Sequence, residues 1–229
     1  MMIPHVKICG ITRPEDALLA VELGATWVGF LFWPESPRWI PPSAAAKILE
    51  RLPPHAIGVG VFVNQAREEI ATVADQVGLG AVQLHGDEDP TLCAGLGRRV
   101  IKAVGLSGQS TERAADSVWS EATVLLDADD RKRRGGTGHR VNWTVAATIA
   151  RRRRTILSGG LTSENVGTAL CQVSPYGIDV SSGVEAEPGI KDPERLRCFF
   201  DAVRLASNKS GVAEGLHRRT WMEGSHDRG

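Results

Sequence analysis

The residues with the clearest potential for chemistry are a cysteine near the start of the chain and an aspartate in its middle. Cys9 ends the β-branched run VKIC (6–9) and precedes a glycine, and Asp127 ends the apolar run TVLLD (123–127). A carboxylate at the end of an apolar run is costly unless it is solvated, paired or used. A thiolate and a carboxylic acid on opposite sides of a substrate could act as a general base and a general acid. Lone cysteines are often small buried hydrophobes, and this alternative for Cys9 stays open.

These residues belong to a chain that alternates short β-branched runs with longer segments of helical spacing. The segment 13–25 begins with a proline and acidic residues, as helix starts prefer, and continues with an apolar stripe. Several strand candidates are apolar nearly throughout, which is typical of a parallel sheet covered on its outer face. The eight strand candidates are 5–9, 27–32, 57–63, 81–85, 99–104, 123–127, 154–158 and 176–181.

Strand–helix alternation repeated eight times predicts a closed (β/α)8 barrel or an open doubly wound sheet. A chain of 229 residues has about the right length for one barrel. We therefore expect a single (β/α)8 TIM barrel, class α/β, as the catalytic domain over residues 1–206. The periodicity stops after this point, and residues 207–229 are expected to form a poorly ordered tail. The segments GVGVFV (58–63) and GGTGHR (135–140) lack the complete patterns of nucleotide-binding loops.

In a (β/α)8 barrel the active site forms at the carboxyl ends of the strands. Cys9 and Asp127 end the first and sixth strands, so their side chains can face each other across the barrel mouth. The same rim is expected to carry Arg38 after strand two, His85 at the end of strand four and Asp179 in strand eight. Arg38 could equally be a surface arginine, and Asp179 could anchor its own loop.

Two glycine-rich loops, SGG (158–160) and SSG (181–183), follow strands seven and eight. In this fold a phosphate often binds between these loops, held by backbone N–H groups and the N-terminus of a short helix. Glycine lets the backbone approach an anion closely, and serine hydroxyls add donors, although the glycines could simply make tight turns. We expect a phosphate site that includes Gly159, Gly160, Ser182 and Gly183.

Composition narrows the classes of function. Apolar residues make up 42% of the chain, and 27 basic residues balance 27 acidic ones, which indicates a globular protein and gives no support for nucleic-acid or membrane-surface binding. The arginine run at 151–154 suits a solvated helix end. The four cysteines form no CxxC pair, so neither a metal site nor a disulfide framework is expected. No signal peptide and no run of roughly 18 apolar residues is evident, and a cytoplasmic protein is expected.

Seven motifs, in order along the chain, resemble those of the phosphoribosylanthranilate isomerase family of tryptophan biosynthesis. Each motif alone is weak evidence, but all seven at barrel spacing are specific, and the resemblance covers residues 5–205. The motifs are KICGIT (7–12), GFLFWPESPR (29–38), GVGVFVNQ (58–65), QLHG (83–86), LLDA with GGTG (125–138), LSGGLTSENV (157–166) and GIDVSSGVE with PGIKD (177–192).

The resemblance implies an Amadori rearrangement of the phosphosugar N-(5′-phosphoribosyl)anthranilate to 1-(2-carboxyphenylamino)-1-deoxyribulose 5-phosphate. It implies that Asp127 protonates the furanose ring oxygen and that Cys9, as thiolate, takes the proton from C2′. Arg38 would contact the anthranilate carboxylate, for which a guanidinium fork is suited, and Asp179 would lie near the anthranilate and ribose. Hydrogen moves within the substrate, so no metal and no other cofactor is expected. Family members occur as monomers and as homodimers, and both states stay open.

Three further expectations concern residues near this pair. His85 is left outside the catalytic set, because a hydrogen bond within the barrel is favoured over a role in shaping the pocket. Lys7 and Lys102 lie in strands, where Schiff-base lysines occur, but packing or a salt bridge is favoured. A free thiol is only a few per cent ionised near neutrality, so the site is expected to favour the thiolate of Cys9.

Two other functions fit parts of the pattern. A histidine-pathway or bifunctional phosphoribosyl isomerase performs the same step on a two-phosphate substrate, but it usually has an aspartate where this chain has Cys9. It also has a phosphate loop in each half-barrel, whereas only the second half of this chain has an SGG loop. A non-catalytic phosphate-binding barrel is the other alternative, and the presence of Cys9, Asp127 and Arg38 argues against it.

Overall fold

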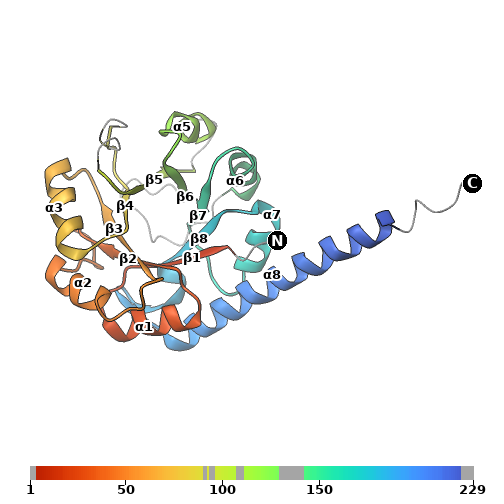
Figure 1. Ribbon diagram of the computed structural model, residues 1–229, viewed down its shortest axis with the longest axis horizontal. Helices are drawn as coiled ribbons and strands as arrows, with labels where there is room; N and C mark the ends of the chain where they lie inside the picture. The colour runs from red at the N-terminus through yellow and green to blue at the C-terminus, as the bar shows by residue number, and fades with distance from the viewer. Residues whose placement is uncertain (1–3, 90–91, 93–95, 107–110, 129–141, 223–229) are drawn as a thin grey trace, which may run out of the picture.

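The computed structural model describes residues 4–89, 92, 96–106, 111–128 and 142–222. Beyond residue 208 it describes the course of the backbone and not the side chains. All eight expected strands are present, and they form a closed barrel in which every neighbouring pair is parallel (Figure 1). β1 pairs with both β2 and β8, which closes the ring. The strands are β1 (His5–Cys9), β2 (Trp27–Leu31), β3 (Ile57–Phe62), β4 (Ala81–Leu84), β5 (Arg99–Gly105), β6 (Thr123–Asp127), β7 (Thr155–Leu157) and β8 (Gly177–Val180).

Helices surround the barrel on its outside, and α8 packs along α7 and α1 (Figure 1). Local sequence explains where several of them begin and end: α1 starts at Pro14 and stops at Gly24, and the Asn142 side chain accepts hydrogen bonds from the first backbone N–H groups of α6. The helices are α1 (Pro14–Leu23), α2 (Pro42–Leu49), α3 (Arg67–Val77), α5 (Thr111–Ser117), α6 (Trp143–Ala150), α7 (Val166–Val173) and α8 (Pro193–Met222).

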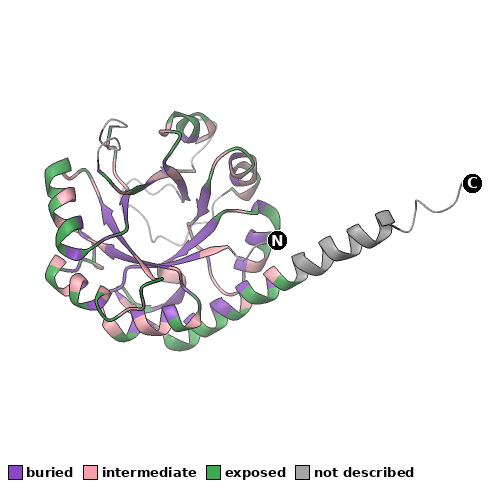
Figure 2. Ribbon diagram, viewed as in Figure 1, coloured by how far each residue is buried: buried purple, intermediate pink, exposed green. Residues whose placement is uncertain are grey.

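The buried side chains form two apolar layers. The larger layer lies between the outer faces of the strands and the helices, as the buried colouring in Figure 2 shows. Because side chains alternate between the two faces of a strand, the remaining strand residues point into the barrel and fill it. The inner layer consists of Trp27, Val59, Ala81, Ile101, Leu125 and Ile156. The barrel interior is therefore packed beneath the carboxyl ends of the strands.

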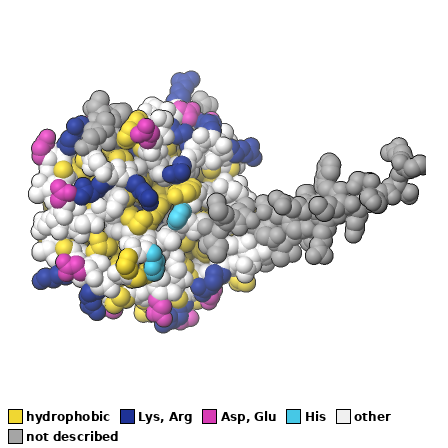
Figure 3. Space-filling model, in the orientation of Figure 1, with side chains coloured by type: hydrophobic (Ala, Val, Ile, Leu, Met, Phe, Trp, Pro, Cys, Tyr) yellow, Lys and Arg dark blue, Asp and Glu magenta, His cyan; other side chains and the backbone are white. Residues whose placement is uncertain are grey.

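An aromatic group covers the amino-terminal end of the barrel. His5 and Trp27, at the starts of β1 and β2, stack with ring centroids 5.0 Å apart, and Tyr176, just before β8, contacts both rings. The arginine run at 151–154 lies beside this end and has partners within the chain. Arg154 lies over the Tyr176 ring, and Arg152 pairs with Asp116. Acidic and basic side chains are interspersed on the face shown in Figure 3.

The carboxyl-terminal side of the chain holds one pair of strands that was not expected. After β8, a short 3-10 helix η2 (Ser182–Val184) leads into an unexpected antiparallel pair, β9 (Glu185–Glu187) with β10 (Ile190–Lys191). α8 continues to Met222, beyond the expected end of the barrel at residue 206. The division between a barrel and a poorly ordered tail stays a prediction. Within the described residues, no helix is long and apolar enough to cross a membrane.

Candidate active site

Cys9 and Asp127 lie at the same end of the barrel, where β1 and β6 finish. In the closed ring β1 and β6 are separated by β7 and β8. Asp127 shares the inward face of β6 with Leu125, a member of the inner layer, and both Cys9 and Asp127 are buried. The structure thus brings the predicted pair to the barrel mouth. The GGTG motif at 135–138 lies outside the described residues.

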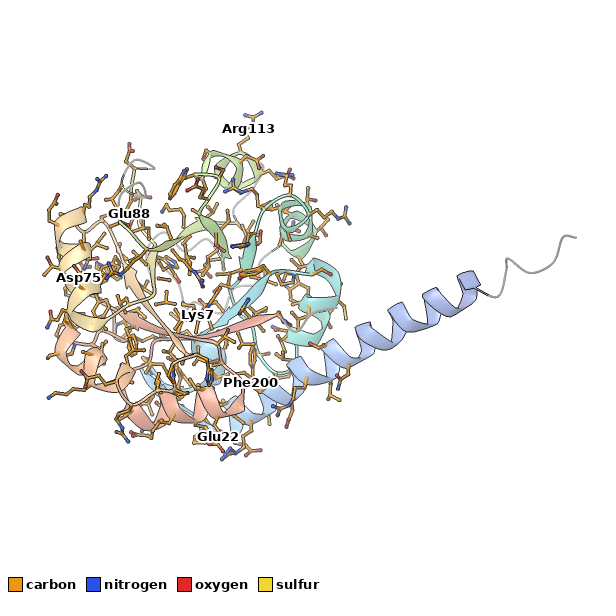
Figure 4. All side chains as sticks on the ribbon, in the orientation of Figure 1. Lys7, Glu22, Asp75, Glu88, Arg113 and Phe200 are labelled. Atoms are coloured by element: carbon orange, nitrogen blue, oxygen red, sulfur yellow. The ribbon has the colours of Figure 1, made fainter. Side chains whose placement is uncertain are left out.

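A buried lysine lies directly beneath Cys9. Lys7 precedes Cys9 by two residues on the inward face of β1 and is 0% exposed, and Figure 4 labels it beside β1, within the ring of strands. Its Nζ donates a hydrogen bond of 3.0 Å to Oδ1 of Asp179 in β8. The predicted salt bridge of Lys7 is therefore confirmed. The carboxylate of Asp179 faces this lysine and balances its positive charge. Without such a partner, a buried ammonium would be strongly destabilising inside the barrel.

Gly29 in β2 leaves the space that this arrangement requires. A Cβ atom at position 29 would lie 3.0 Å from Cys9 Sγ and 3.1 Å from Lys7 Cε. Contacts this short force neighbours to move. Gly10, the residue after Cys9, is also required to be a glycine. Its φ of 77° is in the left-handed region, which other residues rarely adopt. In addition, a Cβ atom at position 10 would lie 2.6 Å from Cδ of Arg38. The glycine after Cys9 therefore lets the chain turn and lets Arg38 approach.

The electrostatic surroundings of Cys9 contradict one expectation. Burial raises the pKa of the Cys9 thiol above its ordinary value, and the nearby Lys7 ammonium offsets this only in part. The prediction that the site favours the thiolate is therefore wrong for the protein without substrate. Burial acts to lower the pKa of Lys7, but Asp179 and Cys9 outweigh it and raise that pKa, so Lys7 keeps its charge.

Arg38 is held by Glu185, a residue that was not among the candidate site residues predicted from the sequence. Its Nε lies 2.9 Å from Oε1 of Glu185, and its Nη2 lies 2.6 Å from Oε2. The pKa of Glu185 is lowered: burial acts to raise it, but hydrogen bonds from Arg38 and the charge of Lys191 prevail. The side chain of Arg38 is 12% exposed, and its Nη1 has no hydrogen-bond partner among the residues described. One side of the guanidinium is therefore fixed while the other keeps free donors.

Lys191 joins this group to the end of β1. Its buried Nζ lies 2.8 Å from Oε1 of Glu185 and 2.5 Å from the backbone oxygen of Cys9. Burial lowers the pKa of Lys191, although Glu185 and Cys9 act to raise it. Glu185 and Lys191 stand in the motif GVE…PGIKD, which was the only sequence signal for them. Together they tie the β9–β10 pair to the backbone that carries the thiol.

Asp127 contacts His85, which follows β4. The distance from His85 Nε2 to Asp127 Oδ2 is 3.2 Å, and Nδ1 of the same ring lies 2.9 Å from Nε2 of Gln83. The favoured interpretation of His85, a hydrogen bond within the barrel, is confirmed, but one of its partners is the candidate acid. Gln83 was missed, because a glutamine in a strand has no distinctive pattern. Lys102 forms the favoured salt bridge, with Glu88 at 2.9 Å.

The loops after β7 and β8 meet as predicted. Gly159 and Gly160 have φ values of 81° and 72°, and the Asn165 side chain donates to the carbonyl oxygen of Gly160 at 2.8 Å. A Cβ at Gly183 would overlap the carbonyl oxygen of Leu161, so the loops approach through backbone alone. In the described part of the chain, four backbone N–H groups of these loops donate to no protein acceptor, namely those of Gly159, Gly160, Ser182 and Gly183.

The fold and the site define a (β/α)8-barrel enzyme with ionisable groups around the carboxyl ends of its strands. Among the described residues, no group of three or more histidine, cysteine or acidic side chains is placed to hold a metal ion. This class hosts many reactions, so the reaction must come from further evidence.

Comparison with known proteins supplies that evidence. The family model for N-(5′-phosphoribosyl)anthranilate isomerase matches residues 6–202. The N-(5′-phosphoribosyl)anthranilate isomerase of Pelobacter propionicus is 47% identical over 205 residues, which are 90% of this chain and 98% of the relative. That of Citrifermentans bemidjiense is 48% identical over 202 residues, 88% of this chain and 98% of the relative.

Solved structures agree. The phosphoribosylanthranilate isomerase of Thermotoga maritima superposes with a TM-score of 0.82 at 45% identity, covering 88% of this chain and 98% of its own. A structure of such an isomerase in complex with reduced 1-(o-carboxyphenylamino)-1-deoxyribulose 5-phosphate gives a TM-score of 0.79 at 44% identity, with the same coverage. The chain belongs to the N-(5′-phosphoribosyl)anthranilate isomerase family. It catalyses the isomerisation of N-(5′-phosphoribosyl)anthranilate to 1-(2-carboxyphenylamino)-1-deoxyribulose 5-phosphate in tryptophan biosynthesis. The expected family, fold and reaction are confirmed.

Proposed function

We propose that Cys9 and Asp127 carry out this isomerisation as general base and general acid. Asp127 gives its proton to the ring oxygen, the bond from C1′ to that oxygen breaks, and the nitrogen lone pair forms a Schiff base. The Cys9 thiolate then takes the C2′ proton, and the electrons of that C–H bond form the enolamine, which tautomerises to the ketone. One observation supports this assignment: both side chains lie on inward faces of strands at the same end of the barrel. Cys9 lies beside Lys7, and Asp127 contacts His85.

The raised pKa of Cys9 determines how the base works. Only a small fraction of the enzyme holds the thiolate near neutrality, and this fraction grows with pH until the pKa is passed. Burial lowers the fraction of thiolate, whereas the positive charge of Lys7 increases it. A less acidic thiol is also a stronger base once ionised, which favours abstraction of a carbon-bound proton.

Arg38 is proposed to bind the anthranilate carboxylate with the donors that Glu185 leaves free. A guanidinium has five N–H groups in a fixed plane, so it can meet one carboxylate on its Nε side and another on its Nη1 side. Glu185 then orients Arg38 and does not block it. Asp179 is proposed to act near the substrate mainly by holding Lys7.

The loops after β7 and β8 are proposed to bind the substrate phosphate. Unpaired backbone N–H groups in left-handed turns form a concave anion site, and those of Gly159 and Gly160 meet this description. Ser182 and Gly183 add the N–H groups at the start of η2. Since hydrogen only moves within the substrate, no metal or other cofactor is proposed. We propose a cytoplasmic enzyme with its catalytic domain at 1–206. Both a monomer and a homodimer remain open proposals, and a structure of the Thermotoga maritima relative describes that protein as dimeric.

Removing either reacting group should abolish turnover in a folded protein. Cys9→Ala and Asp127→Asn are each expected to lower kcat by about three orders of magnitude, the usual range for lost acid–base catalysis. The measurement is the loss of anthranilate fluorescence after N-(5′-phosphoribosyl)anthranilate is generated in situ, with circular dichroism to check folding. Cys171→Ala, which changes an exposed cysteine, is the matched control and should keep full activity. Near-normal turnover by Cys9→Ala would remove the thiol as the base.

The role of Arg38 predicts a change in selectivity. Arg38→Lys should lower kcat/KM for the natural substrate by about 100-fold, because a lysine keeps the charge but loses the fork. The aniline analogue, which lacks the carboxylate, should be processed at nearly the same rate by wild type and variant. Product formation from both compounds is measured by mass spectrometry. An equal loss on both substrates would show that Arg38 acts on the structure of the site and not on the carboxylate.

The phosphate site predicts a difference between two matched glycine variants. Gly160→Ala and Gly78→Ala both place an alanine at a left-handed position, with φ of 72° and 75°, and each should cost about 1 kcal/mol of stability. Gly78 caps α3 with open space around it, so its variant should keep a normal KM. Gly160→Ala should raise KM and the inhibition constant of inorganic phosphate about tenfold. Equal KM values in the two variants would contradict a phosphate site at Gly160.

A further inference from the structure

A line of three side chains runs from the barrel interior to the candidate acid. Gln83 is 1% exposed and shares the inward face of β4 with Ala81 of the inner layer. Its Nε2 lies 2.9 Å from Nδ1 of His85, and Nε2 of His85 lies 3.2 Å from Oδ2 of Asp127. The other carboxylate oxygen of Asp127 accepts the backbone N–H of Ala128 at 2.9 Å.

The polarity of this line follows from what each atom can donate. The amide nitrogen of Gln83 is only a donor, so Nδ1 of His85 must accept. A neutral imidazole that accepts at Nδ1 carries its proton on Nε2. The Nε2–H then donates to Oδ2 of Asp127. Oε1 of Gln83 is buried without a hydrogen-bond partner among the described residues. Within that part of the chain, the hydrogen bond that orients the Gln83 amide is the one to His85.

We propose that Gln83 and His85 are positioning residues for Asp127. Gln83 holds His85 in the neutral Nε2–H form, and His85 uses this N–H to orient the carboxyl group and to stabilise the carboxylate that remains after proton transfer. The proposal deepens the proposed function, because it rests on Asp127 as the general acid. His85 acts through Asp127 and is assigned no contact with the substrate.

The contact strengthens during the reaction. A carboxylic acid oxygen accepts a hydrogen bond weakly, whereas the carboxylate formed as the proton leaves accepts a charge-assisted one. An interaction that is stronger in the transition state than in the ground state lowers the barrier. The N–H groups of His85 and Ala128 hold one oxygen each, so the plane of the carboxyl group is fixed before the substrate binds.

The loop that carries His85 is itself held in place. Oε2 of Glu88 accepts the backbone N–H of Gly86 at 3.0 Å and a hydrogen bond from Lys102 at 2.9 Å. Lys102 also donates to the backbone oxygen of Gly86 at 2.7 Å. A ring anchored by a rigid loop can keep a fixed hydrogen bond with little loss of freedom on reaction.

The tautomer can be observed directly in the full chain. With histidines labelled with nitrogen-15, long-range NMR correlations at mildly alkaline pH distinguish protonated from bare ring nitrogens, and the spectrum of His85→Gln identifies the His85 signals among the six histidines. We expect a protonated Nε2 and a bare Nδ1 in wild type. Gln83→Met, which removes the donor at similar size, should give a mixture of tautomers. A protonated Nδ1 in wild type, or an unchanged tautomer in Gln83→Met, would overturn the proposal.

Kinetics then test the link to Asp127. His85→Leu should lower kcat about 10- to 100-fold with little change in KM, the range for a lost hydrogen bond to a charged group. His85→Gln, which restores a donor, should recover part of the loss, whereas His55→Gln on the surface should leave kcat unchanged. In the Asp127→Asn background, His85→Leu should add almost nothing, since the two residues act as one unit. A full additional loss in that background would overturn the positioning role.

The acid role of Asp127 and the positioning role of Gln83 and His85 can be disproved separately. If Asp127→Asn remains active, the acid role is wrong, while the NMR measurement still reports whether Gln83 sets the tautomer of His85. If Asp127→Asn is inactive but His85→Leu turns over normally, the acid role stands and the positioning role is wrong.

Discussion

The site depends on one buried ion pair, between Lys7 in β1 and Asp179 in β8. A lysine ammonium inside a barrel is strongly destabilising unless a counter-charge satisfies it, and Asp179 provides that charge at 3.0 Å across the two strands that close the ring. The pair therefore couples barrel closure to the chemistry, because Cys9 lies immediately above Lys7 on the same face. Gly29 leaves room for both side chains and would not do so as any other residue.

A second set of charges holds Cys9 from the loop side. Lys191 donates to the backbone oxygen of Cys9 and to Glu185, and Glu185 fixes one edge of Arg38. Two cations and one carboxylate make this set net positive when all three are charged, which suits a substrate that brings its own carboxylate. Cys9, Arg38 and the β9–β10 pair are thus parts of one connected network. Such a network preorganises the positions of its members.

Much of the fold was predictable, because eight β-branched runs at barrel spacing leave few alternative folds. The location of the site was predictable as well, because functional side chains gather at the carboxyl ends of the parallel strands in this fold. Cys9 and Asp127 were predicted as site residues in this way, and the family resemblance added Arg38 and Asp179. The partners of these residues were not, since Glu185 meets Arg38 across 147 positions of sequence and only the folded chain brings them together. The expected thiolate of Cys9 failed for a related reason: burial, which raises its pKa, depends on the packed barrel and leaves no mark in the residues beside it.

We propose that the Lys7 charge holds down the pKa of Cys9 and so makes this thiol usable as a base, and titration of the Cys9 thiolate tests this most directly. The thiolate absorbance of each protein is followed against pH, with the matching Cys9→Ala protein subtracted, in wild type, in Lys7→Met and in Lys7→Met/Asp179→Asn, which also removes the unpaired carboxylate. Loss of the ammonium should raise the pKa of Cys9 further in both variants, and the rise of kcat/KM with pH should move to higher pH by the same amount. A folded Lys7 variant in which both the titration and the rate profile coincide with wild type would contradict the claim.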